Sequence, residues 1–215
     1  FMFLAGVNFS LYFYAITRKF SELKNNSEFK AYISIFVTVI ICLALSLVKY
    51  YGGFAKALRY ASFQVASIMT TTGFVTADIV QWPSVSQFFI FILFFIGGCS
   101  GSTAGSFKVI RWVILAKKAR VEMLKMIHPH GVFTVRVNGS AGREDLVLNI
   151  ASFVFVYFCL AFISTFAATL GGIPLFESFT ASLSMLGNIG PAFGPFADYG
   201  WIPCFLKWIF SFMMI

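Results

Sequence analysis

Two short polar stretches have the residue types that can bind a dehydrated cation through backbone oxygens. One runs from Thr70 to Phe74 and the other from Gly187 to Pro191, and their glycines, Gly73 and Gly190, lie 117 positions apart. A glycine lets the chain turn tightly, and exposed carbonyl groups can replace the water shell of an ion. Each stretch taken alone is also typical of an ordinary polar turn between helices. Because the pattern occurs twice, we predict a repeated ion-binding turn formed by Thr71, Thr72, Gly73, Asn188, Ile189 and Gly190.

A third polar stretch, residues 97–106, consists entirely of small side chains and separates two apolar runs. Irregular backbone at membrane depth is tolerated only where it is buried in protein or lines a water-filled cavity. The stretch therefore predicts a broken helix with an intramembrane loop, whose candidate residues are Gly97, Gly98, Gly101, Ser102, Thr103 and Gly105. A close crossing of helices through small residues is the alternative. A phosphate-binding loop is not supported, because the G-x-x-x-x-G-K-[ST] spacing is missing and no strand is expected before it.

Composition places the chain among membrane proteins. Of its 215 residues, 59% are hydrophobic and only 11% are charged, whereas soluble domains have about 25% charged residues. The four cysteines lie far apart and show no disulfide or metal-binding spacing. The predicted spans contain no Ser/His/Asp cluster, paired carboxylates or metal-ligand set, so we predict that the chain is not an enzyme and needs no organic cofactor.

The net charge of +8 is distributed as expected for a multi-pass membrane protein. Most of the 16 basic residues lie in two polar connections, around residues 18–30 and 108–143, that fall on the same side if the spans alternate. The positive-inside rule makes that side the cytoplasm. Anionic lipid is a suitable partner for such connections, and nucleic acid is not an expected one.

The order of segments predicts an all-α membrane protein built from span–half-helix–turn–span units. Residues 1–30 form the end of a preceding repeat and a cytoplasmic connection, and residues 31–116 form one complete unit. Residues 117–144 form a basic connection, in which residues 132–137 alternate like a strand and Asn138-Gly139 is typical of a turn. Residues 145–215 form a second, truncated unit. Within the units we expect spans at 31–49 and 145–170, half-helices at 56–69 and 175–186, apolar runs at 85–96 and 107–116, and a last helix from about residue 202.

Two units cannot enclose an ion on all sides. A closed ring requires four units, from one chain or from two. The apolar stretch 1–17 ends before the first basic connection and supports the presence of earlier units. We therefore interpret the sequence as a piece of a longer chain.

Three motifs resemble the Trk/Ktr/HKT superfamily of potassium transporters, most closely its bacterial Trk-type subunits. They are Thr-Thr-Thr-Gly-Phe at 70–74, Gly-Gly-Cys-Ser-Gly-Ser-Thr-Ala-Gly at 97–105 followed by Lys108 and Arg111, and Leu-Gly-Asn-Ile-Gly-Pro at 186–191. The resemblance covers essentially the whole chain, which would be the third and fourth of four pore repeats. Ser106 departs from the pattern, because the family usually has another glycine there.

The resemblance implies a pore that takes up K+ across the inner membrane. The six turn residues would form the part of a selectivity filter that binds K+, and the loop at 97–106 would lie below the filter and gate it. It also implies a homodimer and a cytosolic nucleotide-binding regulatory subunit. Na+ coupling, a Ktr-type subunit, or a carrier that alternates access around a central site remain alternatives.

Three further polar side chains have ordinary explanations. His128 and His130 flank Pro129 and are more typical of solvated residues than of a metal pair. Lys207 lies in the predicted last helix, and we expect it to extend to the outer surface or to pair with Asp198 or Glu177.

Overall fold

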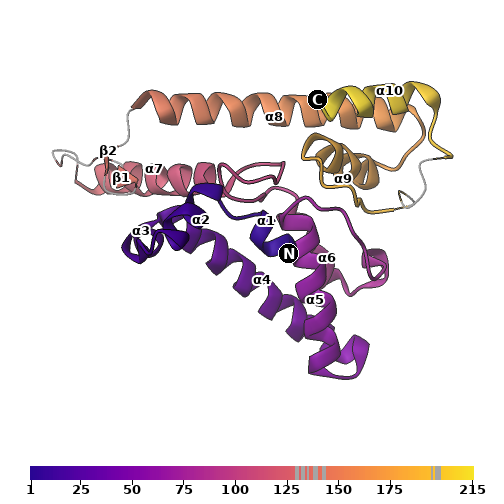
Figure 1. Ribbon diagram of the computed structural model, residues 1–215. Coiled ribbons are helices and arrows are strands. Elements are labelled where there is room, and N and C mark those ends of the chain that lie inside the picture. Colours follow the sequence, from indigo (N-terminus) through magenta and orange to yellow (C-terminus); the bar gives the residue numbers. More distant parts are fainter. Residues whose placement is uncertain are drawn as a thin grey trace.

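The computed structural model describes residues 1–128, 131, 134, 136–137, 140–141, 144–194, 196 and 200–215, and these residues are mainly helical (Figure 1). The elements, in chain order, are α1 (Met2–Ala5), α2 (Phe9–Ile16), α3 (Phe20–Asn25), α4 (Ser27–Tyr51), α5 (Phe54–Met69), the 3-10 helix η1 (Ile79–Gln81), α6 (Ser84–Leu93), α7 (Val109–Ile127), β1 (Arg136–Val137), β2 (Ser140–Ala141), α8 (Glu144–Leu170), α9 (Leu175–Leu186) and α10 (Cys204–Met213).

The predicted unit occurs twice. In the first unit, α4 has 25 residues, about 38 Å at 1.5 Å per residue, and is followed by the shorter α5, which ends at the first polar turn. In the second unit, α8 has 27 residues and is followed by the 12-residue α9, which ends at the second turn. In both units a glycine in the left-handed conformation, Gly52 or Gly172, reverses the chain between the long and the short helix.

Within the described residues, two helices are long and apolar enough to cross a membrane, Ser27–Tyr51 and Val147–Leu170. These agree with the spans predicted at 31–49 and 145–170. The helix α8 leaves large apolar side chains such as Phe155, Phe162 and Phe166 exposed, as a lipid-facing helix would.

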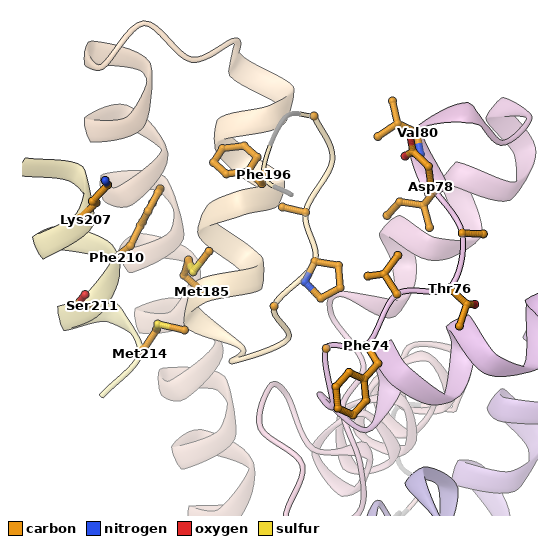
Figure 2. A pocket seen from close by; sticks show the side chains of 18 residues that line it. Phe74, Thr76, Asp78, Val80, Met185, Phe196, Lys207, Phe210, Ser211 and Met214 are labelled. Carbon is orange, nitrogen blue, oxygen red and sulfur yellow. The ribbon is translucent and has the colours of Figure 1, made fainter. Parts of the chain in front are cut away.

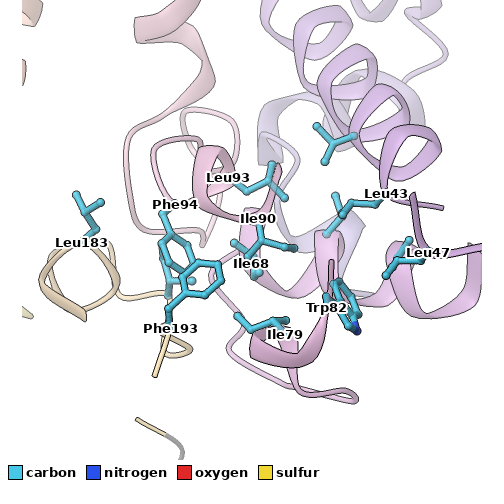
Figure 3. Packing of buried hydrophobic residues seen from close by; sticks show 14 of the residues in the cluster. Leu43, Leu47, Ile68, Ile79, Trp82, Ile90, Leu93, Phe94, Leu183 and Phe193 are labelled. Atoms are coloured by element: carbon cyan, nitrogen blue, oxygen red, sulfur yellow. The ribbon is translucent and has the colours of Figure 1, made fainter. Parts of the chain in front are cut away.

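One hydrophobic cluster joins the two units (Figure 3). It contains Leu43 and Leu47 of α4 and Ile68 of α5, and it continues through α6 to Leu183 of α9. Phe94, at the end of α6, packs edge-on against Phe193 of the second unit, with 5.8 Å between ring centroids. The phenylalanines that make the composition unusual thus hold the two polar turns in a fixed relation to each other.

The helix that follows the first turn is broken, as predicted. Helix α6 ends at Leu93 and α7 begins at Val109, so the whole stretch 97–106 lies between them without helical structure. The second part is longer than the apolar run 107–116 suggests, because α7 continues to Ile127 into the basic connection. Ion pairs of Glu122 with Lys118 (2.7 Å) and Lys125 (3.4 Å) support this extension, and the hydrogen bond from Lys118 lowers the pKa of Glu122 below its usual value.

The N-terminal segment differs from the single span end expected for residues 1–17. It forms two short helices, α1 and α2, that are separated around Gly6. The backbone at Gly6 approaches Tyr32 of α4 so closely that a side chain at position 6 would overlap the tyrosine hydroxyl group. Asn8 then begins α2, because its side chain accepts a hydrogen bond from the backbone N–H of Ser10 (2.8 Å).

In the basic connection, β1 pairs with β2 as an antiparallel hairpin, with Arg136 opposite Ala141. The strand predicted over 132–137 is therefore present at Arg136–Val137. Residues 132, 133 and 135 and the predicted turn Asn138-Gly139 lie outside the described residues. The last helix begins at Cys204, directly after Pro203, close to the predicted start at residue 202.

The packing between α4 and the rest of the first unit generates a stability prediction. Leu43 is completely buried in the cluster that joins the units. Leu43→Ala should lower the free energy of unfolding by about 2–5 kcal/mol through lost contacts and a cavity, whereas Leu43→Met, which keeps the volume, should cost less than about 1.5 kcal/mol. Thermal unfolding of the full-length protein in detergent, at one scan rate, measures both. Equal losses for the two variants would contradict this account.

Candidate functional site

The two polar turns have the same backbone structure. In the first turn, the N–H of Thr71 donates to the carbonyl oxygen of Ile68 (3.0 Å), and that of Thr72 donates to Ser67 (2.8 Å). In the second turn, the N–H of Asn188 donates to Met185 (3.1 Å), and that of Ile189 donates to Ser184 (2.8 Å). Every donor and acceptor is shifted by the same 117 positions as the two glycines. The two turns predicted from the glycines thus share the same pattern of backbone hydrogen bonds.

The backbone angles repeat in the same way. Thr71 and Asn188 both have φ of 52°, and Gly73 and Gly190 have φ of 83° and 101°. Non-glycine residues rarely occupy the left-handed region, and such strain persists only where the surrounding structure enforces it. Each turn therefore contains two left-handed positions, two residues apart, a conformation that does not continue the preceding helix.

The turns lie against each other at their glycines. A Cβ atom added to Gly73 would lie 3.0 Å from the carbonyl oxygen of Ile189, and one added to Gly190 would lie 3.3 Å from the Cα of Gly73. Both positions thus combine a positive φ with close approach of a second backbone, and both conditions favour glycine.

The short helices α5 and α9 end at these turns, at Met69 and Leu186. A helix C-terminus carries a partial negative charge of roughly half an electron. Two such termini at one place favour a cation over an anion.

Beyond the turns, an open groove of about 980 Å³ separates the two units (Figure 2). Its lining begins at the two glycines and includes Phe74, Pro191 and Phe210. Two charged side chains also line it, Asp78 and Lys207. Asp78 accepts hydrogen bonds from the N–H of Val80 (3.0 Å) and the side chain of Gln81 (3.1 Å).

The loop at 97–106 lies on the other edge of the turns. The N–H of Gly105 donates to the side-chain hydroxyl of Thr71 (2.7 Å), and Gly105 also abuts the carbonyl group of Gly187. The loop therefore contacts the first residues of each turn, whereas the groove is lined by the last ones.

The loop is closed at its base. The N–H of Gly97 donates to the carbonyl oxygen of Phe107 (2.9 Å), and that of Val109 donates to Gly98 (3.1 Å). The carbonyl groups that follow the end of α6 are also satisfied across this base, because Phe94 accepts from Ser106 Oγ (3.1 Å) and Phe95 from Trp112 Nε1 (2.8 Å). The small-residue stretch is thus an ordered loop rather than a crossing of helices.

The other predicted loop residues lie at its outer edge, near the N-terminal segment. Gly98 lies against the carbonyl oxygen of Gly6, and Gly101, with φ of 70°, accepts a hydrogen bond from the N–H of Phe9 (3.1 Å). Thr103 donates to the carbonyl oxygen of Ala5 (3.2 Å), and Ser102 Oγ donates to that of Cys99 (2.6 Å). Ser106 has φ of 53°, so the serine occupies a conformation that glycine adopts more easily.

Two charged residues at this loop were not predicted as site residues. The carboxylate of Glu28 accepts hydrogen bonds from the N–H groups of Ser100 and Ile110, and the ammonium group of Lys108 donates to the carbonyl oxygens of Ser102 and Ala104. In the sequence, Glu28 lies in the first basic connection, and Lys108 lies in the apolar run 107–116 beside the second. Glu28 is an acid at the start of a span, a weak signal that could have identified it.

The remaining polar candidates have ordinary surroundings. Lys207 is exposed and donates to the carbonyl oxygen of Gly200 (3.2 Å), consistent with a side chain that extends to the surface. Asp198, its predicted partner, lies outside the described residues, as do Pro129 and His130, whereas His128 ends α7. In the part of the chain that the structure describes, no three His, Cys, Asp or Glu side chains are placed to hold a metal ion.

Comparison with known proteins agrees with these features. The family model described as TrkH, cation transport protein, matches residues 1–215. The Trk system potassium uptake protein TrkH of Escherichia coli is 32% identical over 201 residues, which are 92% of this chain and 42% of that protein. The protein of the same name from Halomonas elongata is 31% identical over all of this chain and 45% of its own length. The chain thus spans less than half the length of the curated relatives it matches.

A solved structure shows the same arrangement of helices. The crystal structure of the potassium transporter TrkH from Vibrio parahaemolyticus superposes with a TM-score of 0.89 at 30% sequence identity, over 99% of this chain and 47% of that one. This match confirms the predicted helical fold class. The relatives are transport proteins and not enzymes, in agreement with the prediction from the sequence. With its full length matched by the family model, the chain belongs to the TrkH family of cation transport proteins.

Proposed function

We propose that this chain forms two of the four repeats of a pore that carries K+ into the cell across the inner membrane. The relatives named for potassium uptake support K+ as the transported ion. The observation that carries the proposal is the pair of turns with identical hydrogen bonds that meet at Gly73 and Gly190. Two further units, from the rest of the protein, would complete the ring.

In this proposal the filter works through its backbone. Carbonyl groups of Thr71, Thr72 and Gly73 in one unit, and of Asn188, Ile189 and Gly190 in the other, would replace the water around K+. None of these residues is titratable, so selectivity would depend on the number and field strength of the oxygens. The partial charges at the ends of α5 and α9 would favour a cation there.

The groove beyond the glycines would be the outer entrance to the filter. Asp78 places a carboxylate on its wall, where it would raise the local concentration of cations. The loop at 97–106 would act as the gate, because it contacts Thr71 and Gly187 on the opposite edge of the turns.

A channel-like pore is better supported than alternating access. Carriers of that type often contain inverted repeats, whereas basic stretches precede both α4 and α8 and would place the start of each span on the same side. A second copy of the protein and a cytosolic nucleotide-binding subunit are the partners we propose. Helix α7 extends beyond the apolar run into the basic connection. This connection is a suitable docking surface for the nucleotide-binding subunit.

The filter assignment predicts the effect of a side chain at Gly73. Gly73→Ser should reduce the preference for K+ over Na+, because a Cβ there would press on the carbonyl oxygen of Ile189, 3.0 Å away, and strain a φ of 83°. Flux of K+, Rb+ and Na+ from liposomes containing the full-length protein measures this preference. Gly172→Ser is a matched control, since Gly172 also has a positive φ but no heavy atom within 4 Å of the added Cβ. Unchanged selectivity in Gly73→Ser would refute the filter assignment.

The gating assignment predicts that loss of the Thr71 hydroxyl increases the flux of K+. Thr71→Ala removes the hydroxyl that accepts the N–H of Gly105, and this loss should raise K+ flux severalfold by weakening the hold on the loop. Thr71→Ser keeps the hydroxyl and should behave like the unchanged protein. The same liposome assay compares the two variants, and a Thr71→Ala protein that is folded but no more active would argue against gating by the loop.

A further inference from the structure

The intramembrane loop is held by an acidic residue from another part of the chain. Glu28 lies in the first turn of α4 and is only 4% exposed. Its Oε1 atom accepts hydrogen bonds from the N–H of Ser100 (2.5 Å) and from the N–H of Ile110 (3.2 Å). These contacts join residues separated by 72 and 82 positions in the sequence.

One donor lies within the loop and the other lies beyond its end. Ser100 belongs to its first half, and Ile110 lies in the first turn of α7, where backbone N–H groups have no partner within the helix. A carboxylate there benefits from the positive end of the helix dipole and forms charge-assisted hydrogen bonds. One buried oxygen therefore fixes the loop to the start of α7.

A basic residue holds the second half of the loop. The ammonium group of Lys108 donates to the carbonyl oxygens of Ser102 (3.4 Å) and Ala104. The carboxylate thus accepts from a backbone N–H of the loop and the ammonium donates to backbone carbonyl oxygens of the loop, in addition to the hydrogen bonds made by Thr103 and Ser106.

Glu28 also belongs to the first cytoplasmic connection, residues 18–30, whose last residues begin α4. Asn26, two residues earlier, ends α3 and begins α4, and its side chain accepts a hydrogen bond from the N–H of Phe29 (3.0 Å). A displacement of α3 would therefore move the start of α4 and the carboxylate with it. At its other edge the loop contacts Thr71 of the first turn.

We propose that Glu28 is a positioning residue that holds the loop against the filter turns and transmits movement of the first cytoplasmic connection, residues 18–30, to that loop. This inference rests on the proposed function, since it assigns the regulation of the same pore. Loss of the carboxylate should free the loop without altering the turns, because Glu28 contacts Ser100 and Ile110 rather than the filter residues.

The test is Glu28→Gln in the full-length protein reconstituted in liposomes. The glutamine keeps the size of the side chain and an oxygen that can accept both hydrogen bonds, but it removes the charge that strengthens them. K+ flux should rise roughly tenfold, because charge-assisted hydrogen bonds are about twice as strong as neutral ones. The ratio of K+ to Na+ flux should not change. Glu22→Gln is the matched control, because Glu22 is an exposed acid on α3 and its loss removes the same charge from the same connection.

A second measurement follows the loop directly. Thr103→Cys, in a chain whose four native cysteines are replaced by alanine, reports how fast a water-soluble maleimide reaches the loop. Labelling should be faster in the Glu28→Gln background than in the Glu22→Gln background. If Glu28→Gln does not give a folded protein, Lys108→Met removes the opposite contact to the loop and should also accelerate labelling and flux.

The outcomes separate this inference from the proposed function. Flux and labelling that match the Glu22→Gln control would overturn the role of Glu28, and so would a loss of selectivity, which would mean that the carboxylate supports the filter. If the unchanged protein carried no K+, the proposed function would fall. The labelling comparison would still decide whether Glu28 positions the loop, because it does not depend on ion flux.

Discussion

Backbone polar groups within an apolar layer must find partners, and this constraint organises the structure around the break between α6 and α7. A helix that stops at membrane depth leaves carbonyl groups on one side and N–H groups on the other without partners. Here the carbonyl groups of Phe94 and Phe95 accept hydrogen bonds from Ser106 and Trp112, across the base of the loop. The N–H of Ile110 is satisfied by Glu28. Because these partners come from both sides of the break, the loop has a defined shape.

The second organising feature is the close approach of two backbones at Gly73 and Gly190. Each glycine adopts a left-handed conformation and also leaves room for the backbone of the other unit. Any side chain at either position would therefore disturb both the turn and the contact. The turns differ in their side chains, because Thr70 and Thr72 share a hydroxyl hydrogen bond (2.7 Å) where the second turn has Gly187 and the buried Ile189. In a pore of this kind only the carbonyl groups would face the ion. The backbone must then be the same in each repeat, whereas the side chains can differ.

The loop connects both turns with the start of α4 and with the N-terminal segment. It contacts Thr71 and Gly187 at one edge, and Glu28 and the N-terminal segment around Gly6 at the other. The contacts to small residues are short and made largely by backbone atoms, so a modest displacement would break several of them together. Glu28 and Lys108 each hold this loop through its backbone, the carboxylate through N–H groups and the ammonium through carbonyl groups.

The sequence by itself determined the class of the protein, the order of its segments and the location of both turns. Long apolar runs, half-length amphipathic runs and a small-residue stretch are local patterns, and they predicted α4, α8, α9 and the loop within a few residues. Local patterns failed where a distant contact decides, as at Gly6, where the hydroxyl group of Tyr32 leaves no room for a side chain at the bend between α1 and α2. They also placed the end of α7 too early, because its ion pairs stabilise helix beyond the apolar run.

Only the tertiary structure decided that the two turns meet and that the loop is bound to Thr71, Glu28 and Lys108. No periodicity in the sequence indicates that Glu28 reaches Ser100 and Ile110, because a hydrogen bond to a backbone N–H places no demand on the residue type of its partner. The sequence specifies which segments can cross a membrane and where they must bend. The folded chain specifies which bends share their polar groups, since that depends on distances that local patterns do not contain.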